Sequence, residues 1–279
     1  MKSLGRIYSN STNDLESLWR QSSPIVIGMR ENKKDALRLV LVRTRNPLNI
    51  GAAARAMSNF GFMHLRVVNP YETAFREARS AVGASPLLAG AEQYPSVAEA
   101  VADCTLVVGT TAAGNRELHH PLRRLDLGRK LIHQELRSGR VALLFGSEKV
   151  GLSNEDFSHC HWLLRIPTRD EHSSMNLGQA VAVCLYELAR GLDESNISQS
   201  QKPRRQQRAS AAEVERIAAL LLETLHASGY LKPNATPATE AKVRRLVRRL
   251  NLAAEDAEVW LGIFRQIAWK ITAAHDKKK

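Results

Sequence analysis

The chain has 279 residues, of which 44% are apolar, so it is large enough to bury a core and is not disordered as a whole. Forty Lys and Arg residues against 28 Asp and Glu residues give a net charge of +12, which favours a polyanionic partner such as nucleic acid. No stretch is apolar enough for a spanning helix or a signal peptide, so we expect a cytoplasmic protein that does not bind a membrane. The three cysteines, Cys104, Cys160 and Cys184, contain no Cys-x-x-Cys pair and predict neither a disulfide framework nor a zinc site.

The first 37 residues contain Ser, Asn and Gln clusters and one short apolar run, so residues 1–37 are predicted to be an N-terminal extension. From Leu39 onward, short apolar runs alternate with longer amphipathic ones. The runs typical of strands are 39–42, 65–68, 105–108, 141–145 and 162–166, and those typical of helices are 50–60, 96–102, 127–137 and 177–190. This alternation predicts an α/β domain over residues 38–192, with a mostly parallel sheet and a ligand site at the carboxyl ends of its strands.

Residues 193–209 lose the apolar periodicity and are rich in Gln, Ser and Arg, which predicts a basic linker. Helical spacing returns at 214–226, 241–250 and 257–273, so we expect a small all-α domain over residues 210–279. In the second of these helices an apolar stripe is formed by Val243, Leu246, Val247 and Leu250. The basic residues between them are predicted to lie on the outer surface: Lys242, Arg244, Arg245, Arg248 and Arg249.

Several common motifs are missing from the chain. It has no G-x-G-x-x-G turn, which removes the main support for a dinucleotide site. Residues 146–153 have the glycine spacing of a P-loop, but Leu152 occupies the position of the phosphate-binding Lys, so nucleotide hydrolysis is not expected. The adjacent residues His159, Cys160 and His161 point in different directions along the chain, and no metal is expected there.

Three segments that follow predicted strands are rich in Gly, Ser, Thr and Asn, and the first covers residues 43–55. It turns at Pro47 and enters a helix through Gly51 and three alanines, which places Arg55 one turn into a helix whose N-terminus faces the ligand edge. An Arg at that position can hold an anionic group. An exposed Arg in a surface salt bridge explains the pattern equally well.

The second segment covers residues 145–153, where two glycines bracket Ser147 and Glu148. Such a loop can pass its backbone closely around a ligand, and a plain turn is an equally good explanation. The third segment, residues 166–177, leads into a helix that is apolar nearly all round and is therefore deeply buried or shared with a second subunit. Within it, helix capping is the more common role for residues such as Asn176.

The sequences NIGAAAR at 49–55, FGSEKVGLS at 145–153 and SSMNLGQAV at 173–181 resemble three motifs of the SPOUT-class TrmH-like RNA 2′-O-ribose methyltransferases. The C-terminal sequence further resembles the TrmJ branch of that family, which methylates nucleotide 32 in the tRNA anticodon loop. The resemblance implies a sheet whose C-terminal part forms a trefoil knot, a homodimer, S-adenosylmethionine bound in the knotted loops, and tRNA as substrate. Ser147 and Met175 depart from the usual residues of the motifs, Arg and Leu, and leave the substrate assignment less sharp.

The resemblance also implies roles for individual residues. The catalytic positions correspond to Arg55, Ser174 and Asn176. The cofactor-binding positions correspond to Thr110, Thr111, Ala112, Gly146, Ile166, Ser173, Ser174 and Met175. The residues expected to contact RNA are Asn49, Arg245 and Arg249. The two arginines belong to a basic helix that follows a basic linker, an arrangement that suits contacts with phosphates.

A ribose 2′-hydroxyl is a weak nucleophile while it is protonated, so methyl transfer to it requires alignment and removal of a proton. A guanidinium group keeps its proton at neutral pH, so we favour Arg55 as an electrostatic clamp on phosphate and the developing oxyanion. A role as base stays open if cationic neighbours lower its pKa. Two alternatives also stay open: the same chemistry on another tRNA position or on rRNA, and a catalytically silent RNA-binding or chaperone protein.

Overall fold

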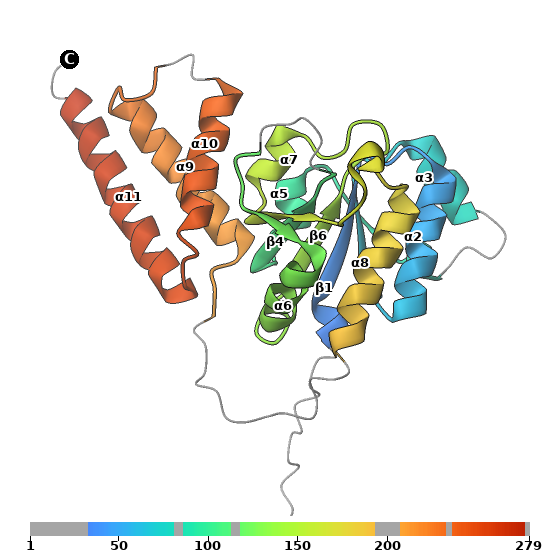
Figure 1. Ribbon diagram of the computed structural model, residues 1–279. Helices are drawn as coiled ribbons and strands as arrows, with labels where there is room; N and C mark the ends of the chain where they lie inside the picture. The colour runs from blue at the N-terminus through green and yellow to red at the C-terminus, as the bar shows by residue number, and fades with distance from the viewer. Residues whose placement is uncertain (1–32, 81–85, 113–117, 193–206, 233–235, 277–279) are drawn as a thin grey trace, which may run out of the picture. The chain divides into compact units, whose positions relative to one another are not determined.

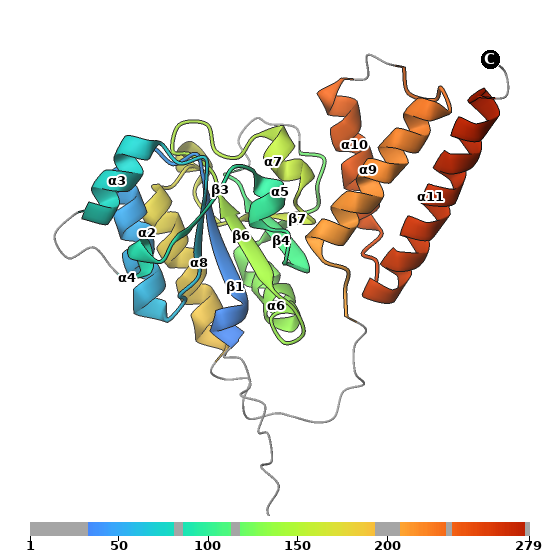
Figure 2. The same ribbon diagram turned by 180° about the vertical axis from the view of Figure 1, so that it is seen from behind.

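The computed structural model describes residues 33–80, 86–112, 118–192, 207–232 and 236–276 (Figures 1 and 2). Most of the predicted N-terminal extension and most of the predicted basic linker, residues 1–32 and 193–206, lie outside the described residues. Within the described part, no helix is both long enough and apolar enough to cross a membrane.

Seven strands form one sheet, and every strand pair in it is parallel. The strands are β1 (Leu37–Val42), β2 (Leu65–Val68), β3 (Glu92–Tyr94), β4 (Leu106–Thr110), β5 (Leu122–Arg124), β6 (Val141–Phe145) and β7 (Trp162–Arg165). All residues of β1, β2 and β6 are buried, which explains why these strands have nearly continuous Val and Leu runs. The prediction of a mostly parallel α/β sheet is therefore confirmed.

The order of the strands across the sheet is β3-β2-β1-β6-β4-β7-β5. Strand β6 pairs with both β1 and β4, and β7 pairs with both β4 and β5. Because all these strands run in the same direction, the loops after β1, β4, β6 and β7 leave the sheet at the same edge. Segments separated by about a hundred residues in the sequence are thus brought together there.

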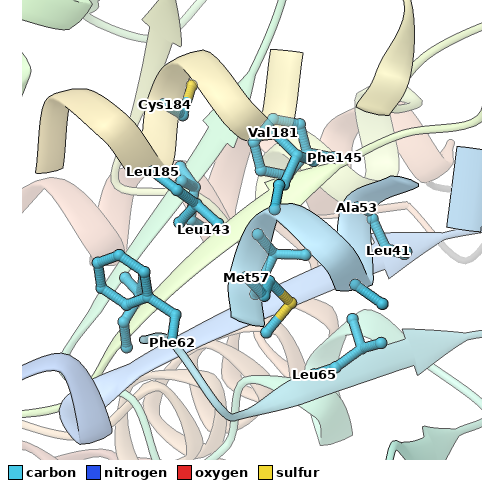
Figure 3. Packing of buried hydrophobic residues seen from close by; sticks show 14 of the residues in the cluster. Leu41, Ala53, Met57, Phe62, Leu65, Leu143, Phe145, Val181, Cys184 and Leu185 are labelled. Carbon is cyan, nitrogen blue, oxygen red and sulfur yellow. The ribbon is translucent and has the colours of Figure 1, made fainter. Parts of the chain in front are cut away.

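Helices cover both faces of the sheet. They are α2 (Pro47–Phe60), α3 (Glu72–Ser80), α4 (Pro86–Ala89), α5 (Val97–Ala100), α6 (Leu125–Glu135), α7 (Asn154–Ser158) and α8 (Leu177–Leu192), with short 3-10 helices at Lys33–Ala36 and Asp170–His172. Successive residues of a strand point to opposite faces, so Leu39 and Leu41 pack with α2 and α8, whereas Val40 and Val42 pack with α5 and α7. Figure 3 shows the layer between the sheet and helices α2 and α8, where Met57 and Leu185 lie beside sheet residues such as Leu143.

The predicted strands and helices are present, with shifted ends. The strands at 65–68 and 141–145 match the prediction, but β3 and β5 were not predicted, because their sequences, EQY and LRR, are polar and short. Helix α2 begins three residues before the predicted start, where Asn46 accepts a hydrogen bond from the N–H of Leu48 and Pro47 occupies the first turn. Arg55 consequently lies more than two turns inside α2, which corrects the predicted single turn.

Three C-terminal helices, α9 (Ala211–Ala227), α10 (Pro237–Arg249) and α11 (Ala254–Asp276), share a small apolar core (Figure 1). Ser210 and Glu213 form a capping box at the start of α9. The first residues of α9 also bond the sheet-containing part of the chain, because Ala211 N–H donates to Cys104 O at 2.8 Å and Ala212 N–H donates to Ala102 O at 3.1 Å.

The predicted orientation of α10 is wrong in part. Arg248 was predicted on the outer surface but is only 2% exposed, and Arg244 is half-buried. Leu246 and Leu250 were predicted in the apolar stripe but are 51% and 48% exposed. The physical reason is that α10 packs against both α9 and α7, and the polar groups of α7 bind the guanidinium groups that the pattern assigned to solvent.

Candidate functional site

A cavity of about 530 Å³ lies at the carboxyl ends of the strands, a size typical of sites for small ligands. Its wall is formed mainly by the ends of β4 and β6 with the loops after them, the segment after β7 and the start of α8, and α2 and α7 each add one residue. The residues that line it are Asn49, Thr110, Thr111, Ala112, Phe145, Gly146, Ser147, Glu148, Lys149, Val150, Gly151, Leu152, Phe157, Leu164, Ile166, Thr168, Ser173, Ser174, Met175, Asn176, Leu177 and Ala180.

All eight residues expected to bind the cofactor line this one cavity. The end of β4 is held by hydrogen bonds to its neighbouring strands, since Thr110 Oγ1 donates to Leu144 O of β6 at 2.8 Å and Thr111 N–H donates to Leu164 O of β7 at 3.0 Å. The segment before α8 is held by the hydroxyl of Thr168, which donates to Ser173 O at 3.3 Å. The structure thus brings together residues from four segments, and their binding of a cofactor stays a prediction.

The loop after β6 folds back on itself so closely that Gly146 has no space for a side chain. A Cβ atom at Gly146 would lie 2.1 Å from the carbonyl carbon of Gly151 and 2.2 Å from the nitrogen of Leu152. The N–H of Gly151 donates to Ser147 O at 2.8 Å, and Gly151 itself has a φ of +68°. Both glycines are therefore required by the internal geometry of the loop, which presents its backbone to the cavity.

Glu148 links this loop to the loop after β1. Its carboxylate accepts hydrogen bonds from the N–H groups of Arg45 and Asn46, both at 3.2 Å, and from Asn49 Nδ2 at 3.0 Å. Burial by itself raises the pKa of Glu148, but the hydrogen bonds from Asn49 and from backbone N–H groups outweigh it, so the pKa is lowered. Glu148 is therefore an anion at neutral pH, and its donors are neutral groups.

The same network reaches the segment before α8 through Asn49 and Asn176. The side-chain amide of Asn176 donates to Asn49 Oδ1 at 2.9 Å, and its carbonyl oxygen accepts from Gln179 N–H at 3.3 Å. Asn176 therefore caps α8 and also faces the cavity, so the two interpretations of this residue are compatible. Asn49, expected to contact RNA, is 8% exposed and lies within this network, while Ser174 is exposed and lines the cavity.

The sequence analysis assigned no role to Glu148. The sequence nevertheless contained a signal for Glu148, because a carboxylate between two loop glycines at the ligand edge of a parallel sheet is a candidate functional residue. Its partners could not be identified, since Asn49 lies 99 residues away in the sequence.

In the single chain, Arg55 is not one of the described residues around the cavity. It lies on an exposed part of α2 and is absent from the described residues that line the cavity. The neighbouring helix surface carries exposed apolar side chains, including Leu48 of α2 and Val183 and Tyr186 of α8, which are 79%, 38% and 53% exposed. Helices α2 and α8 pack directly against each other, with the rings of Phe60 and Tyr186 in edge contact.

Helix α7 connects the cavity to the rest of the molecule. Its buried Asp156 forms a salt bridge with Arg43 at the end of β1 and closes a capping box with Ser153. The next residue, Phe157, lines the cavity. Its ring lies 6.2 Å from the ring of His120.

The charges of Arg245 and Arg249 of α10 act on His120, in the segment before β5. Burial lowers the pKa of His120 to about 4, and the charges of Arg245 and Arg249 contribute to that shift. Arg249 is exposed and Arg245 is half-buried. The charges of these two predicted RNA-binding residues thus act on His120, whose ring is beside that of the cavity-lining Phe157.

The residues His159, Cys160 and His161 each face a different environment. His161 Nδ1 accepts from the N–H of Val107 at 3.0 Å, Cys160 is buried, and His159 faces α9 and α10. In the part of the chain that the structure describes, no three His, Cys, Asp or Glu side chains are close enough together to hold a metal ion.

Residues 36–186, more than half of the chain, match the model of the SpoU rRNA methylase family. The chain is 34% identical over 233 residues to the tRNA (cytidine/uridine-2′-O-)-methyltransferase TrmJ of Sodalis glossinidius, covering 83% of this chain and 91% of that protein. It is also 34% identical over 238 residues to TrmJ of Escherichia coli K12, covering 83% and 94%. The crystal structure of TrmJ from Z. mobilis superimposes with a TM-score of 0.69 and 31% identity, over 82% of this chain and 98% of that one. The chain belongs to the SpoU rRNA methylase family and is a methyltransferase.

Proposed function

We propose that the protein transfers a methyl group from S-adenosylmethionine to a ribose 2′-hydroxyl of tRNA. The observation that carries the proposal is the convergence of three motif segments, far apart in the sequence, on one cavity. The sequence relatives support tRNA as the substrate, because their names give tRNA cytidine and uridine 2′-O-methylation as their activity.

The cavity suits S-adenosylmethionine in size and in lining. Apolar side chains such as Leu152, Ile166 and Leu177 offer contacts for flat and aliphatic groups, and the exposed backbone of the loop after β6 offers hydrogen bonds. We assign the binding of the cofactor to the eight predicted residues, with Gly146 and Met175 on two of the loops. When bound, the cofactor supplies a methyl group already activated by a sulfonium charge.

The chain's own residues have to orient the ribose and manage charge. Asn176 and Ser174 are assigned to orienting the hydroxyl or the end of the cofactor that carries the methyl group. Arg55 is assigned to an electrostatic clamp on a backbone phosphate and the developing oxyanion, since a guanidinium group is a poor base.

A homodimer reconciles that role with the position of Arg55 outside its own chain's cavity. We assign the dimer interface to α2 and α8, whose shared surface exposes Leu48, Val183 and Tyr186. Apolar side chains gathered on two neighbouring helices favour association with a second surface. In this arrangement Arg55 of one subunit acts at the cavity of the other.

A trefoil knot in the C-terminal part of the sheet is also part of the proposal. Its support is the strand order, in which β6 lies between β1 and β4 and β7 lies between β4 and β5. We divide the chain into an N-terminal extension over 1–37, a SPOUT methyltransferase domain over 38–192, a basic linker over 193–209 and a helical RNA-docking domain over 210–279. The shared core of α9, α10 and α11 supports the last of these.

We assign nucleotide 32 of the anticodon loop as the target, on the resemblance to the TrmJ branch, and the cytoplasm as the location. Arg245 and Arg249 are assigned to contacts with tRNA phosphates. The alternatives are another tRNA position, rRNA, and an RNA-binding protein without turnover.

The deciding experiment is transfer of a radiolabelled methyl group from S-adenosylmethionine to unmodified tRNA, followed by mapping of the modified nucleotide. Arg55→Ala is expected to lower kcat/KM by about 100-fold or more, because it removes charge stabilisation of the transition state. Arg76→Ala, which removes an exposed Arg from α3, is the matched control and should retain activity.

Full activity of Arg55→Ala would overturn the role of that residue. A wild-type protein that binds the cofactor and tRNA but transfers no methyl group would favour the silent RNA-binding protein. The mapped nucleotide distinguishes position 32 from the other RNA targets.

A further inference from the structure

A cluster of charged and polar side chains lies where α9 and α10 meet α7. We call it the α7 joint and define it as Ser158, His159, Glu215, Arg244 and Arg248. Arg248 is 2% exposed, and its guanidinium donates to Ser158 O at 2.9 Å, His159 Nδ1 at 3.2 Å and Glu215 Oε2 at 2.6 Å. Arg244 donates to Glu215 Oε1 at 2.7 Å and to Ser158 Oγ at 3.3 Å.

The joint is organised around a single carboxylate. Each carboxylate oxygen of Glu215 accepts a hydrogen bond from one guanidinium group. Both guanidinium groups also donate to Ser158 of α7. Burying an Arg costs free energy that an apolar residue at the same place would avoid. Such a cluster is therefore better explained by the orientation that its directed hydrogen bonds impose than by stability alone.

The orientation that the joint imposes determines where the other basic residues of α10 lie. Arg245 and Arg249 each follow directly after a joint residue on the same helix. They are carried by the helix that packs against α7, and Phe157 of α7 lines the cavity. A rotation of α10 about its axis would break the hydrogen bonds of the joint and would also turn Arg245 and Arg249 in another direction.

Helix α7 is itself fixed to the cavity loops. Asp156 pairs with Arg43 at the end of β1, and Phe157 lines the cavity. The joint residues Ser158 and His159 follow immediately in the sequence. Through the short helix α7, the position of the two cations of α10 is thus fixed relative to the cavity.

We propose that Glu215 is a positioning residue for RNA, which holds α10 on α7 so that Arg245 and Arg249 face the phosphates next to the target ribose. This inference rests on the proposed function. It adds a role for a half-buried anion that itself contacts neither the RNA nor the cofactor.

The test compares Glu215→Gln with Glu223→Gln, which removes the same charge from an exposed position on the same helix α9. Affinity for unmodified tRNA is measured by filter binding across a salt series, and affinity for S-adenosylmethionine is measured in the same preparations. Glu215→Gln is expected to raise the Kd for tRNA by about tenfold and to make its salt dependence shallower by roughly one to two counterions. Affinity for the cofactor and kcat at saturating tRNA should stay close to wild type.

A second measurement separates positioning from general destabilisation. The Arg245→Ala/Arg249→Ala pair should weaken tRNA binding strongly in the wild type and weakly in the Glu215→Gln background, because cations that no longer face the phosphates contribute little to binding. Additive effects would overturn the inference. So would a Glu215→Gln variant with wild-type tRNA affinity, or one whose cofactor affinity falls by the same factor as its tRNA affinity.

If Glu215→Gln does not fold, Arg244→Ala removes one of the two bonds to Glu215 from a half-buried position and is expected to raise the Kd for tRNA by a smaller factor, about threefold. An unchanged Kd in that variant would count against the inference. Absence of methyl transfer by the wild type would overturn the proposed function. The measurements of tRNA binding would still test whether Glu215 positions Arg245 and Arg249.

Discussion

Two carboxylates hold distant parts of this protein together, and they do so in different ways. Among the described residues, the partners that donate to Glu148 beside the cavity are neutral groups: two backbone N–H groups and the amide of Asn49. Glu215 in the α7 joint accepts from two guanidinium groups. Both have a lowered pKa, but only Glu215 has its charge neutralised by its partners.

The difference shows how similar side chains are used for separate purposes. An anion held by neutral donors keeps its charge and contributes to the electrostatic potential of the cavity, while its charge-assisted hydrogen bonds hold the loops after β1 and β6 together. An anion held between two cations contributes little field and mainly sets a geometry. We therefore expect changes at Glu148 to affect catalysis, and changes at Glu215 to affect stability and substrate binding.

The largest effect we expect is a loss of stability at acid pH that depends on Glu215. Burial by itself raises the pKa of Glu215, but the ring of His159 and the charges of Arg248 and Arg244 outweigh it and lower the pKa from 4.5 to about 2. A lowered pKa in the folded state contributes stability above pH 4.5, and this contribution is lost as the pH falls from 4.5 to about 2. The shift corresponds to about 3 kcal/mol of unfolding free energy.

Urea denaturation at a series of pH values measures this dependence. Glu215→Gln should have a flatter profile in that interval than wild type, while Glu223→Gln should follow wild type. Equal slopes for Glu215→Gln and wild type would show that the two guanidinium groups do not stabilise the charged form of Glu215.

The next largest effect is expected at the other carboxylate. Glu148→Gln keeps the shape but places an NH2 group or a neutral oxygen against the N–H groups of Arg45 and Asn46, so the loops after β1 and β6 lose their charge-assisted hydrogen bonds. We expect kcat/KM for methyl transfer to fall by about 100-fold, with a smaller change in thermal stability.

Steady-state kinetics at saturating S-adenosylmethionine test this expectation. Glu155→Gln, an exposed carboxylate on the adjacent helix α7, is the control and should be nearly neutral. Wild-type activity in Glu148→Gln would show that the charge of the cavity is dispensable and would remove the distinction between the two carboxylates.

The smallest effects concern the face that α10 buries. Val247 is 2% exposed and Leu246 is 51% exposed, although both belong to the apolar stripe of the sequence. Val247→Ala should therefore cost about 2 kcal/mol of unfolding free energy, and Leu246→Ala about 0.5 kcal/mol. Chemical denaturation of the two variants measures the difference, and equal costs would instead agree with the orientation predicted from the sequence, in which both side chains belong to the apolar stripe.

The core of the sheet was largely predictable. Buried parallel strands have nearly continuous apolar runs, so β2 and β6 were located to the residue. The edge strands β3 and β5 were not found, because their residues are exposed or half-buried and their extended conformation comes from pairing with β2 and β7. Pairing of this kind leaves no local apolar pattern.

The candidate site was predictable as a set of loops but not as a network. The residues expected to bind the cofactor all line one cavity because parallel strands end at one edge. The hydrogen bonds that Asn49 donates to Glu148 and that Asn176 donates to Asn49 span 99 and 127 residues, so no local pattern reveals them. Arg55 was found by its motif, but its distance from the cavity depends on where α2 begins and on which helices it contacts.

The amino-acid sequence alone determined the α/β class, the positions of the central strands and the three loops that meet at the cavity, because buried strands and turns have a characteristic local composition. Tertiary structure decided which polar groups meet, including the burial of Arg248 between α9 and α7 and the bonds that Glu148 accepts. The physical reason is that a charged side chain becomes buried only where its partners are already in place, and those partners come from distant parts of the chain.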